Sequence, residues 1–519
     1  MLDRERVIAE IAQEVVSRLQ THLRVHPSAT AAAPSAAAPV SSAGRPAAPA
    51  SGAHAPATAA HAPATAAHAP AAAASPLGHG VFATVDEAVG AAARAQVRIA
   101  EMSLEERERI VSVIKRVCEE RAEELGRREL EETGVGRLDH KIAKLEAVRH
   151  VLGVEAMRTE ARGDASGLCV IEHAPWGVVG MLLPVTHSVP TMAGNAVNAI
   201  AAGNSAVFNP HPSGAKVAAY ALQLLNREIE SAAGVADAMT TVSAPSLRTA
   251  EELFQHPGVA LLCITGGPAV VQAAMRSGKR VIAAGPGNPP VVVDETADLD
   301  AAARAIVQGA SFDNNLLCIG EKEVFVVAAV AGAFMSALKR AGAHEIDEPA
   351  VERLARAAFR LEGNGKGCGR AHLRTDLIGK DAAVLAAAAG VRVPPGTPLL
   401  FGETREDHPF VQEEQMMPFL PVVRVPDVDA AIAAAKRAEH SYRHTALMHS
   451  RDVARATRMA RALDTTLFVH NAPCTAALGI DGPGYLSYSI ATPTGEGVTT
   501  PLTFTRERQI AVSGALRIV

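Results

Sequence analysis

The sequence predicts an α/β protein built on doubly wound parallel sheets. Beyond residue 80, short apolar runs alternate with alanine-rich stretches that are long enough for helices. Two strands joined by such a helix run parallel in one sheet, because the helix carries the chain back to the edge where the first strand began. The expected strands are 177–183, 205–209, 261–265, 281–283, 290–294 and 324–328, and a mainly helical segment, 85–149, precedes them.

Composition excludes several classes of protein. The 519-residue chain is 48% hydrophobic with a net charge of -5, which suits large buried cores in about two to four domains. Its longest apolar run, 324–334, is too short to cross a bilayer, and its charged N-terminus does not resemble a secretory signal. It has no basic run or aromatic-basic cluster that would suit nucleic acid. We therefore expect neither a membrane nor a nucleic-acid partner.

The cysteines indicate a reducing, cytoplasmic compartment. None of the six forms a Cys-x-x-Cys pair, which argues against both a zinc ribbon and a disulfide framework. A free thiolate persists in a reducing compartment, and we expect no metal site. The cysteines are Cys118, Cys169, Cys263, Cys318, Cys368 and Cys474.

The N-terminal region predicts an amphipathic helix on a flexible tether. In residues 1–24, Ile8, Ile11 and Val15 recur at helical spacing opposite a charged face. Residues 25–80 are almost entirely Ala, Pro, Ser, Thr, Gly and His, with too little large apolar surface to offset the entropy of ordering. Flexible-chain scaling separates the ends of this linker by about 40 Å. The helix either packs on its own domain or, as the tether favours, binds a partner protein.

Six motifs occur in an order that resembles the aldehyde dehydrogenase superfamily, and within it the CoA-acylating branch found in bacterial microcompartments. The resemblance covers the chain from about residue 81 to the C-terminus. The motifs are EHAPWGVVG (172–180), AAGNSAVFNPHP (201–212), ITGG (264–267), FDNNLLCIGE (312–321), EEQMMP (413–418) and TPTGEGVTT (492–500).

The resemblance implies three parts in the globular region. These are a Rossmann-type NAD-binding domain over 81–288, with an arm segment at about 163–174, and an α/β catalytic domain over 289–480. Residues 481–519 then form a C-terminal segment with a β oligomerisation arm.

Cys318 is the candidate nucleophile. It follows the polar run Asp313-Asn-Asn315 and precedes an apolar strand, so we expect it in a loop at a sheet edge, where sites form. A free cysteine is more often a small buried apolar residue, but the resemblance matches Cys318 to the nucleophile of the family. His187 lies near the position where relatives supply an oxyanion asparagine. It is an oxyanion donor, a proton shuttle or a structural residue.

The resemblance also implies a surface for NAD. The ITGG turn ends a strand and opens a helix, so its free N–H groups suit a pyrophosphate. Glu414 matches the residue that holds the nicotinamide ribose. Asn209 stands where hydrolytic relatives place a lysine near the adenosine ribose, which leaves NAD versus NADP open. The full predicted set is Thr265, Gly266, Gly267, Asn209, Pro210, Glu414, Pro184 and Gly285.

Ala283 separates the branches of the family. Hydrolytic aldehyde dehydrogenases have a glutamate at the matching position, and it activates the water that releases the acid. Without that carboxylate, an acyl group on Cys318 resists water but is open to the thiol of CoA. The resemblance thus implies reversible, NAD-dependent oxidation of acetaldehyde, propionaldehyde or lactaldehyde to acyl-CoA. The alternatives are a hydrolytic enzyme, an acyl-phosphate reductase and an inactive shell cargo or assembly protein.

The resemblance also implies two kinds of protein partner, a shell protein and further copies of the chain. Residues 1–24 resemble the terminal helices by which cargo enzymes bind a microcompartment shell protein, which implies a place in the lumen of that compartment. Segments 167–173 and 501–519 match the arm by which members of the superfamily pair their subunits. We therefore expect a homodimer or a homotetramer.

Overall fold

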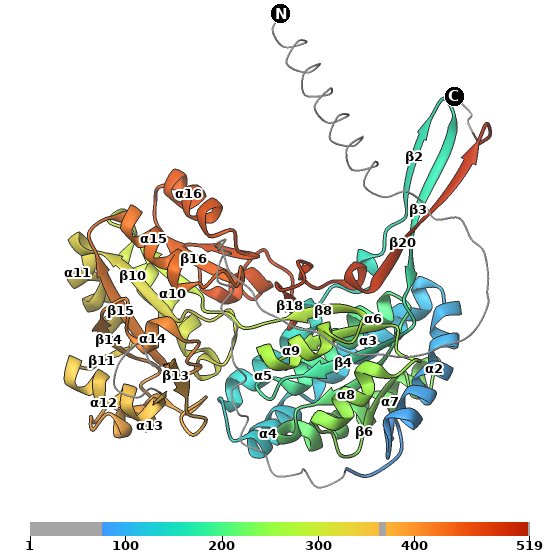
Figure 1. Ribbon diagram of the computed structural model, residues 1–519, viewed down its shortest axis with the longest axis horizontal. Coiled ribbons are helices and arrows are strands. Elements are labelled where there is room, and N and C mark those ends of the chain that lie inside the picture. The colour runs from blue at the N-terminus through green and yellow to red at the C-terminus, as the bar shows by residue number, and fades with distance from the viewer. Residues whose placement is uncertain (1–74, 363–369, 517–519) are drawn as a thin grey trace, which may run out of the picture. The chain divides into compact units, whose positions relative to one another are not determined.

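The structure, a computed structural model, describes residues 75–362 and 370–516. Within these ranges the chain forms two parallel β-sheets covered by helices, one three-stranded antiparallel sheet and two short hairpins (Figure 1). The predicted α/β class with parallel sheets is confirmed. No helix in these ranges has the length and apolar character needed to span a membrane. The predicted helix 1–24 and its tether up to residue 74 lie outside the described residues.

Helices form most of the segment that the sequence predicts as helical from 85 to 149. Thr84 and Ser103 cap the first two helices, because each hydroxyl accepts the N3 backbone N–H and the N3 glutamate returns a bond. Gly134, at φ +65°, ends the third helix in the left-handed conformation that glycine adopts readily. The elements are α2 Val85–Glu101, α3 Leu104–Glu120, α4 Ala122–Thr133, α5 Leu138–Glu146, η1 Ala147–His150 and η2 Val154–Ala156.

The first sheet has six parallel strands in the order β1-β6-β5-β4-β7-β8. The chain runs outward from β4 through β5 to β6, then returns to the other side of β4 for β7 and β8. This reversal is a topological switch point, and open α/β sheets bind ligands there at the carboxyl ends of the strands. The strands are β1 Val81–Phe82, β4 Val178–Leu183, β5 Ser205–Pro210, β6 Met239–Val242, β7 Leu261–Thr265 and β8 Arg280–Ala284. The connections contain α6 Ser188–Ala201, η3 Pro212–Gly214, α7 Ala215–Ala233, α8 Leu247–Gln255 and α9 Pro268–Met275.

Both faces of this sheet are buried. In β4, Val179 and Met181 belong to one apolar core with residues of α3, α6 and α7. Val178 and Leu182 belong to a second core with residues of α2 and α8. Successive side chains of a strand point to opposite faces, so a strand between two helical layers is apolar at every position.

The second sheet has seven parallel strands in the order β11-β14-β15-β10-β9-β16-β17. The chain enters it after β8, through the glycine turn 285–289. The strand expected at 324–328 spans Glu323–Val327, because Ala328 begins a helix. The strands are β9 Pro290–Val293, β10 Glu323–Val327, β11 His344–Glu345, β14 Leu400–Thr404, β15 Phe419–Val425, β16 Thr445–His449 and β17 Leu467–His470. Among them lie α10 Leu299–Ser311, η4 Phe312–Asn315, α11 Ala328–Arg340, α12 Glu348–Ala358, the hairpin β12 Phe359–Glu362 with β13 Arg370–Leu373, α13 Ala382–Ala388, α14 Pro409–Gln412, α15 Val428–Ala438 and α16 Val453–Leu463.

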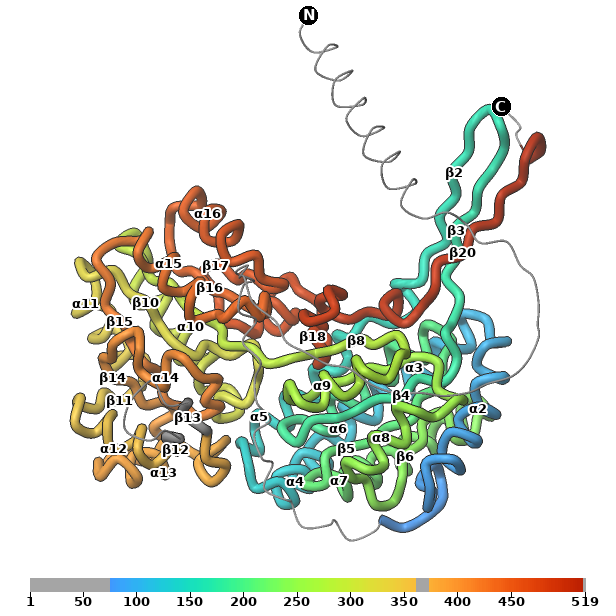
Figure 2. The backbone as a smooth tube through the Cα atoms, in the orientation of Figure 1, coloured from blue at the N-terminus to red at the C-terminus, as the bar shows by residue number. Residues whose placement is uncertain are grey.

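Three antiparallel strands lie side by side in the segments predicted as an arm (Figure 2). The central strand, β3 Gly167–Pro175, pairs with β2 Glu160–Asp164 on one side and with β20 Thr505–Ser513 on the other. All side chains of β2 are exposed. Residues Pro501–Phe504 form a 3-10 turn, η6, so the strand of the C-terminal tail begins at Thr505.

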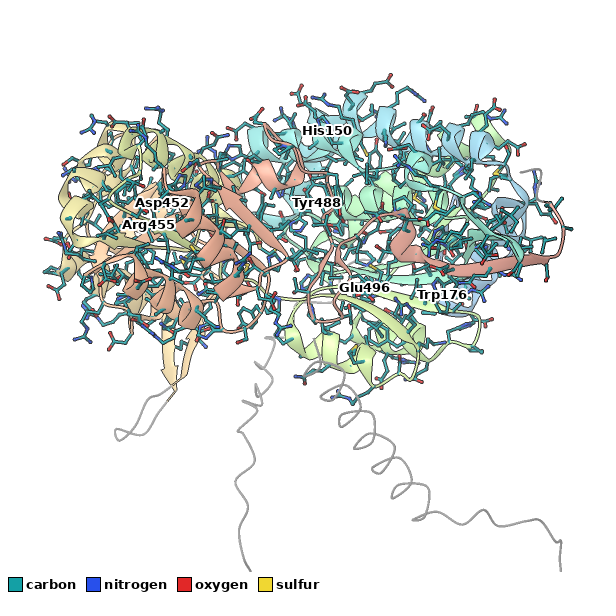
Figure 3. The ribbon with its side chains drawn as sticks, turned by 90° about the horizontal axis from the view of Figure 1, so that it is seen from above. His150, Trp176, Asp452, Arg455, Tyr488 and Glu496 are labelled. Carbon is teal, nitrogen blue, oxygen red and sulfur yellow. The ribbon has the colours of Figure 1, made fainter. Side chains whose placement is uncertain are left out.

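The C-terminal segment returns to the first sheet. After η5 Cys474–Leu478, the hairpin of β18 Ile490–Ala491 with β19 Gly497–Val498 contacts β8. Two contacts of this part of the chain involve Trp176 and Glu496, which are labelled in Figure 3. The Trp176 indole donates to the Thr505 carbonyl at 3.0 Å, and Arg280 pairs with Glu496 at 3.2 Å.

Residues 75–80 differ from the linker that their composition predicts. The Ser75 N–H donates to the Ser243 carbonyl at 2.9 Å, and Gly78 and Val81 form a β-bridge. Gly80 has φ +94°, and a Cβ atom there would lie 2.2 Å from the Asn226 amide. The packed chain therefore already includes Ser75, held by backbone bonds and a glycine conformation that composition does not reveal.

Candidate active site

Cys318 follows a strained loop. The three residues after Phe312 have left-handed backbone conformations, with φ of 49° at Asp313, 55° at Asn314 and 64° at Asn315. Asn and Asp tolerate this region better than other side chains, which accounts for the polar run in the sequence. The Asn315 amide donates to the carbonyls of Ala310 and Glu321 at 2.9 and 2.8 Å. The loop is thus fixed on both sides of the cysteine.

A buried ion pair holds this loop to the first sheet. Lys144 Nζ, from α5, lies 2.5 Å from Asp313 Oδ2, and both side chains are almost fully buried. The same ammonium donates to the Thr186 carbonyl at 3.1 Å. Asp313 Oδ1 accepts the Arg137 N–H at 2.8 Å. Burial opposes ionisation, but the charge of Lys144 keeps the pKa of Asp313 below its usual value. Lys144 therefore ties the loop after β4 to the loop before Cys318.

The Cys318 thiol is protonated at neutral pH. The side chain is half-buried, and burial, with a smaller contribution from the charge of Glu414, raises the pKa of the thiol to about 12. Lys322 opposes this shift from four residues further on. Its buried ammonium donates to the carbonyls of Asn315 and Leu317 at 2.8 and 3.2 Å. A thiol of this kind needs a base before it can act as a nucleophile.

The glycine turn after β8 contacts the backbone of Cys318. A Cβ atom on Gly287 would lie 2.6 Å from the Cys318 carbonyl oxygen and 2.9 Å from His444 Cγ, so only glycine fits. The Gly287 N–H donates to the Glu414 carboxylate, whose pKa burial raises to about 7. At Gly285, a Cβ atom would lie 2.8 Å from Pro493. The turn thus brings Gly285, Glu414 and Cys318 into one region.

His444 is a residue of the site that the motifs did not reveal. It precedes β16 and is buried, and burial, together with the charge of Lys322, lowers its pKa to about 4. Its Nδ1 lies 2.8 Å from the Thr445 hydroxyl, and its buried Nε2 has no hydrogen-bond partner among the described residues. The ring is therefore neutral at physiological pH and retains a free nitrogen. The only signal in the sequence is a histidine that directly precedes a buried strand of the catalytic sheet.

His187 belongs to the buried network around Lys144. It directly precedes α6, is 5% exposed and packs on Tyr488 with ring centroids 5.6 Å apart. Burial and the charge of Lys144 place its pKa well below the usual value. Its Nδ1 has no partner among the described residues, and Tyr488, labelled in Figure 3, donates to the Lys144 carbonyl at 2.6 Å. A neutral imidazole retains one N–H that can donate to an oxyanion, so the protonation state is compatible with that predicted role.

The other predicted NAD residues lie at the carboxyl edge of the first sheet. Pro184 follows β4, whose last residue pairs with Pro210 at the end of β5. Thr265 ends β7, and Gly266 and Gly267 open α9. A Cβ atom on either glycine would meet nothing within 4 Å, so the backbone is open to a close ligand. This crevice at the switch point between β4 and β7 suits a dinucleotide.

Asn209 lies at this edge with its side chain already engaged. Its Oδ1 accepts the Thr249 hydroxyl at 2.6 Å, and its Nδ2 donates to the Ser246 carbonyl at 3.4 Å. Both polar atoms therefore bond to the first turn of α8. To hold a ribose, Asn209 would use its backbone, or its side chain would exchange these two hydrogen bonds for bonds to the ribose.

Ala283 is fully buried in β8 and offers no carboxylate. Its N–H donates to the Thr494 hydroxyl at 2.9 Å, and it pairs with Ile264 of β7. Two buried glutamates, Glu321 and Glu323, follow Cys318 in the chain. Glu321 accepts the Cys474 N–H at 2.9 Å, and burial raises its pKa to about 7. Burial also raises the pKa of Glu323, to well above its usual value.

These features are a crevice that suits a dinucleotide and a candidate nucleophile, Cys318, and comparison with known proteins identifies the family. The sequence profile of the aldehyde dehydrogenase family matches residues 76–484. The chain therefore belongs to the aldehyde dehydrogenase family, and the resemblance seen in its motifs is confirmed.

Two relatives show which members of the aldehyde dehydrogenase family this chain is similar to. The acetaldehyde dehydrogenase (acetylating) EutE of Salmonella typhimurium is 46% identical over 443 residues, which are 85% of this chain and 94% of the relative. The propanal dehydrogenase (CoA-propanoylating) of the same organism is 38% identical over 445 residues, 85% of this chain and 94% of the relative.

Two solved structures share the fold. One is the propionaldehyde dehydrogenase of Rhodopseudomonas palustris with bound CoA and an acylated cysteine. It has a TM-score of 0.82 and 41% identity, and the match covers 85% of this chain and all of that one. The other is the propionaldehyde dehydrogenase of the Clostridium phytofermentans fucose utilisation bacterial microcompartment. Its TM-score is 0.81 at 40% identity, with the same coverage.

Lys144→Met tests the buried ion pair. We expect it to lower the free energy of unfolding by about 3 to 5 kcal/mol, because Asp313 remains as an uncompensated buried charge. The value of kcat should fall too, since Thr186 and Asp313 lose their common tie. Chemical denaturation and steady-state kinetics measure the two effects.

Arg116→Met is the matched control. It removes an exposed ion pair with Glu228 at 3.1 Å and should change stability by less than about 1 kcal/mol. Equal stability of the two variants would contradict the importance assigned to Lys144.

Proposed function

We propose that this chain oxidises a short-chain aldehyde with NAD and passes the acyl group to CoA through a thioester on Cys318. It is an oxidoreductase of the CoA-acylating aldehyde dehydrogenase branch, as the sequence predicts. One observation carries the mechanism. Cys318 and the neutral His444 meet at Gly287, whereas Ala283 occupies the position of the water-activating carboxylate. Acetaldehyde and propionaldehyde are the leading substrates, since the most similar relatives reported above act on them.

His444 serves as the base. Almost no Cys318 thiolate is present at neutral pH, because the pKa of the thiol is about 12. As the sulfur attacks the aldehyde carbon, its proton passes to the free Nε2 of His444. Hydrogen bonds from the N–H groups of Cys318 and Ile319 stabilise the developing thiolate.

The oxyanion and the cofactor lie on the side of the first sheet. The Cys318 N–H and the neutral ring of His187 stabilise the hemithioacetal oxygen. NAD, when bound at the switch point, supplies the acceptor for the hydride. Thr265, Gly266, Gly267, Pro184, Gly285 and Glu414 hold it there, and a thioester remains on Cys318.

CoA completes the reaction. Its thiol attacks the thioester, the new carbon–sulfur bond forms, and the bond to Cys318 breaks. The proton of CoA passes through His444 to the Cys318 sulfur. Aldehyde, CoA and NAD thereby give acyl-CoA, NADH and a proton. One thioester replaces another, so the exchange is nearly isoenergetic and the enzyme works in both directions.

A burst experiment tests the acyl acceptor. With aldehyde and NAD but no CoA, the enzyme should release at most about one equivalent of NADH per site and then nearly stop, because no carboxylate at position 283 activates water. Addition of CoA should restore turnover. Absorbance of NADH follows both phases.

Cys318→Ala should abolish the burst and the turnover together. Sustained NADH production without CoA, with free acid at a comparable rate, would make the enzyme hydrolytic. Absence of any NADH with both substrates would favour the inactive cargo protein.

The three-stranded arm supports assembly with a second copy. Within the described chain, β20 pairs only with β3, which leaves its other edge unpaired. Nine exposed or half-exposed residues line this long strand, and such edges are normally covered. We propose a homodimer or a dimer of dimers that is joined through this edge.

Truncation after residue 504 tests the assembly. It removes β20, so light scattering should report a monomer where the full chain gives a dimer or tetramer. A full chain that is a stable and active monomer would exclude the proposal.

We propose that residues 1–24 direct the enzyme to a microcompartment shell. Their apolar stripe in the sequence, and a relative from a bacterial microcompartment, support binding to a shell protein and a location in the compartment lumen. The described catalytic residues all lie beyond residue 74, so this segment is not needed for chemistry.

A fusion of residues 1–30 to a fluorescent protein should co-sediment with shells. Ile11→Asp combined with Val15→Asp should abolish this by charging the stripe. Deletion of residues 1–74 should leave activity in solution intact. Equal packaging of the charged variant would show that the stripe is not the recognition surface.

A further inference from the structure

The loop that carries His444 to Cys318 is built around one buried carboxylate. Glu439 directly follows α15 and is 2% exposed. Its Oε1 accepts the His444 N–H at 2.9 Å, and its carboxylate also accepts the N–H groups of Ser441 and Arg443. Three backbone donors of a six-residue loop thus converge on a single side chain.

The backbone of this loop is strained. His440, Ser441 and Arg443 have φ values of 55°, 61° and 55°, in the left-handed region that disfavours residues with a Cβ atom. Such conformations persist only where the surroundings hold them. Left-handed residues turn successive N–H groups to one side and form a cradle for an anion. Here the carboxyl group of Glu439 occupies the cradle. Burial raises its pKa to about 7, and the three N–H groups oppose that shift because they favour the charged form.

Other contacts fix the ends of the loop, and two bonds reach its middle. His440 Nε2 lies 2.8 Å from the Gln412 carbonyl oxygen, and the Tyr442 N–H donates to the backbone carbonyl of Glu439 at 3.1 Å. The Asn288 amide donates to the Ala438 carbonyl at 2.9 Å, just before Glu439. The carbonyls of Arg443 and His444 accept backbone bonds of 2.8 and 3.0 Å from the chain that leads into β17. The Glu439 carboxylate adds the bonds at Ser441, Arg443 and His444, which these contacts do not supply.

We propose that Glu439 is a positioning residue for the acyl-transfer reaction, because its carboxylate holds the 439–444 loop in the conformation that places His444 beside Cys318. The inference rests on the base function proposed for His444. Without the carboxylate, three backbone N–H groups lose their acceptor, and the loop relaxes toward ordinary backbone conformations. The His444 ring then moves away from the sulfur.

Kinetics of Glu439→Ala test the inference in the full chain. We expect kcat with aldehyde, NAD and CoA to fall by about tenfold to a hundredfold, which is the effect of misplacing a catalytic group by about 1 Å. The KM for aldehyde should change little, because Glu439 contacts no substrate. Glu439→Gln keeps an acceptor oxygen of the same reach and should recover most of kcat.

Asp427→Ala is the matched structural control. Asp427 caps the other end of α15, where its carboxylate accepts the Ala430 N–H at 2.9 Å. Its loss should lower the melting temperature and leave kcat unchanged. An equal fall in kcat for Asp427→Ala and Glu439→Ala would reduce Glu439 to a stabilising residue and overturn the inference.

A double-mutant cycle with His444→Ala separates this inference from the function beneath it. If Glu439 acts through His444, the double variant is no slower than His444→Ala alone. Should Glu439→Ala not fold, Glu439→Asp replaces it in the same cycle with the same expectation.

The outcomes distinguish two failures. A slow His444→Ala variant with normal kcat in Glu439→Ala, or effects of the two that multiply, would overturn the positioning role alone. Normal kcat in His444→Ala would overturn the base function itself.

Discussion

The buried ion pair between Lys144 and Asp313 is the interaction on which the active site depends. Two charges removed from water stabilise a protein little, because their desolvation offsets their attraction. The ion pair instead fixes the relative positions of two loops of the active site. One ammonium reaches the loop after β4, through the Thr186 carbonyl, and the loop before the nucleophile, through Asp313. The oxyanion side and the sulfur side of the reaction therefore share one fixed point.

Close backbone contact is the second constraint. The turn after β8 and the Cys318 loop approach so closely that Gly287 cannot carry a side chain. In the loop before Cys318, Asp313, Asn314 and Asn315 adopt left-handed conformations. Hydrogen bonds from the side-chain amides of Asn314 and Asn315 compensate for part of the strain. The site is thus assembled from backbone segments that only particular residue types permit, which accounts for glycines and asparagines in its motifs.

Burial sets the protonation states for this chemistry. It raises the pKa of the Cys318 thiol and lowers that of His444, so the resting pair is a neutral thiol and a neutral imidazole. Such a pair avoids a buried charge in the resting enzyme, and in the proposed mechanism the proton moves to the histidine only when the substrate is attacked. With Ala283 in place of a carboxylate, no base is directed at water, and a thiol from outside is the natural acceptor. In the proposed mechanism, the alanine and the histidine together favour the acyl-CoA product.

The sequence by itself determined the fold class and predicted the nucleophile. Alternation of apolar runs with helical stretches predicted the parallel sheets, because both depend on local periodicity. Motif order predicted Cys318, Glu414 and the ITGG turn. Tertiary structure alone decided the parts of the site that depend on distant partners. Lys144 meets Asp313 across 169 residues, and His444 meets the Cys318 backbone only through the packing of Gly287. Neither lysine nor histidine stands in a recognisable motif, since their function arises from burial and contact, which a linear pattern does not encode.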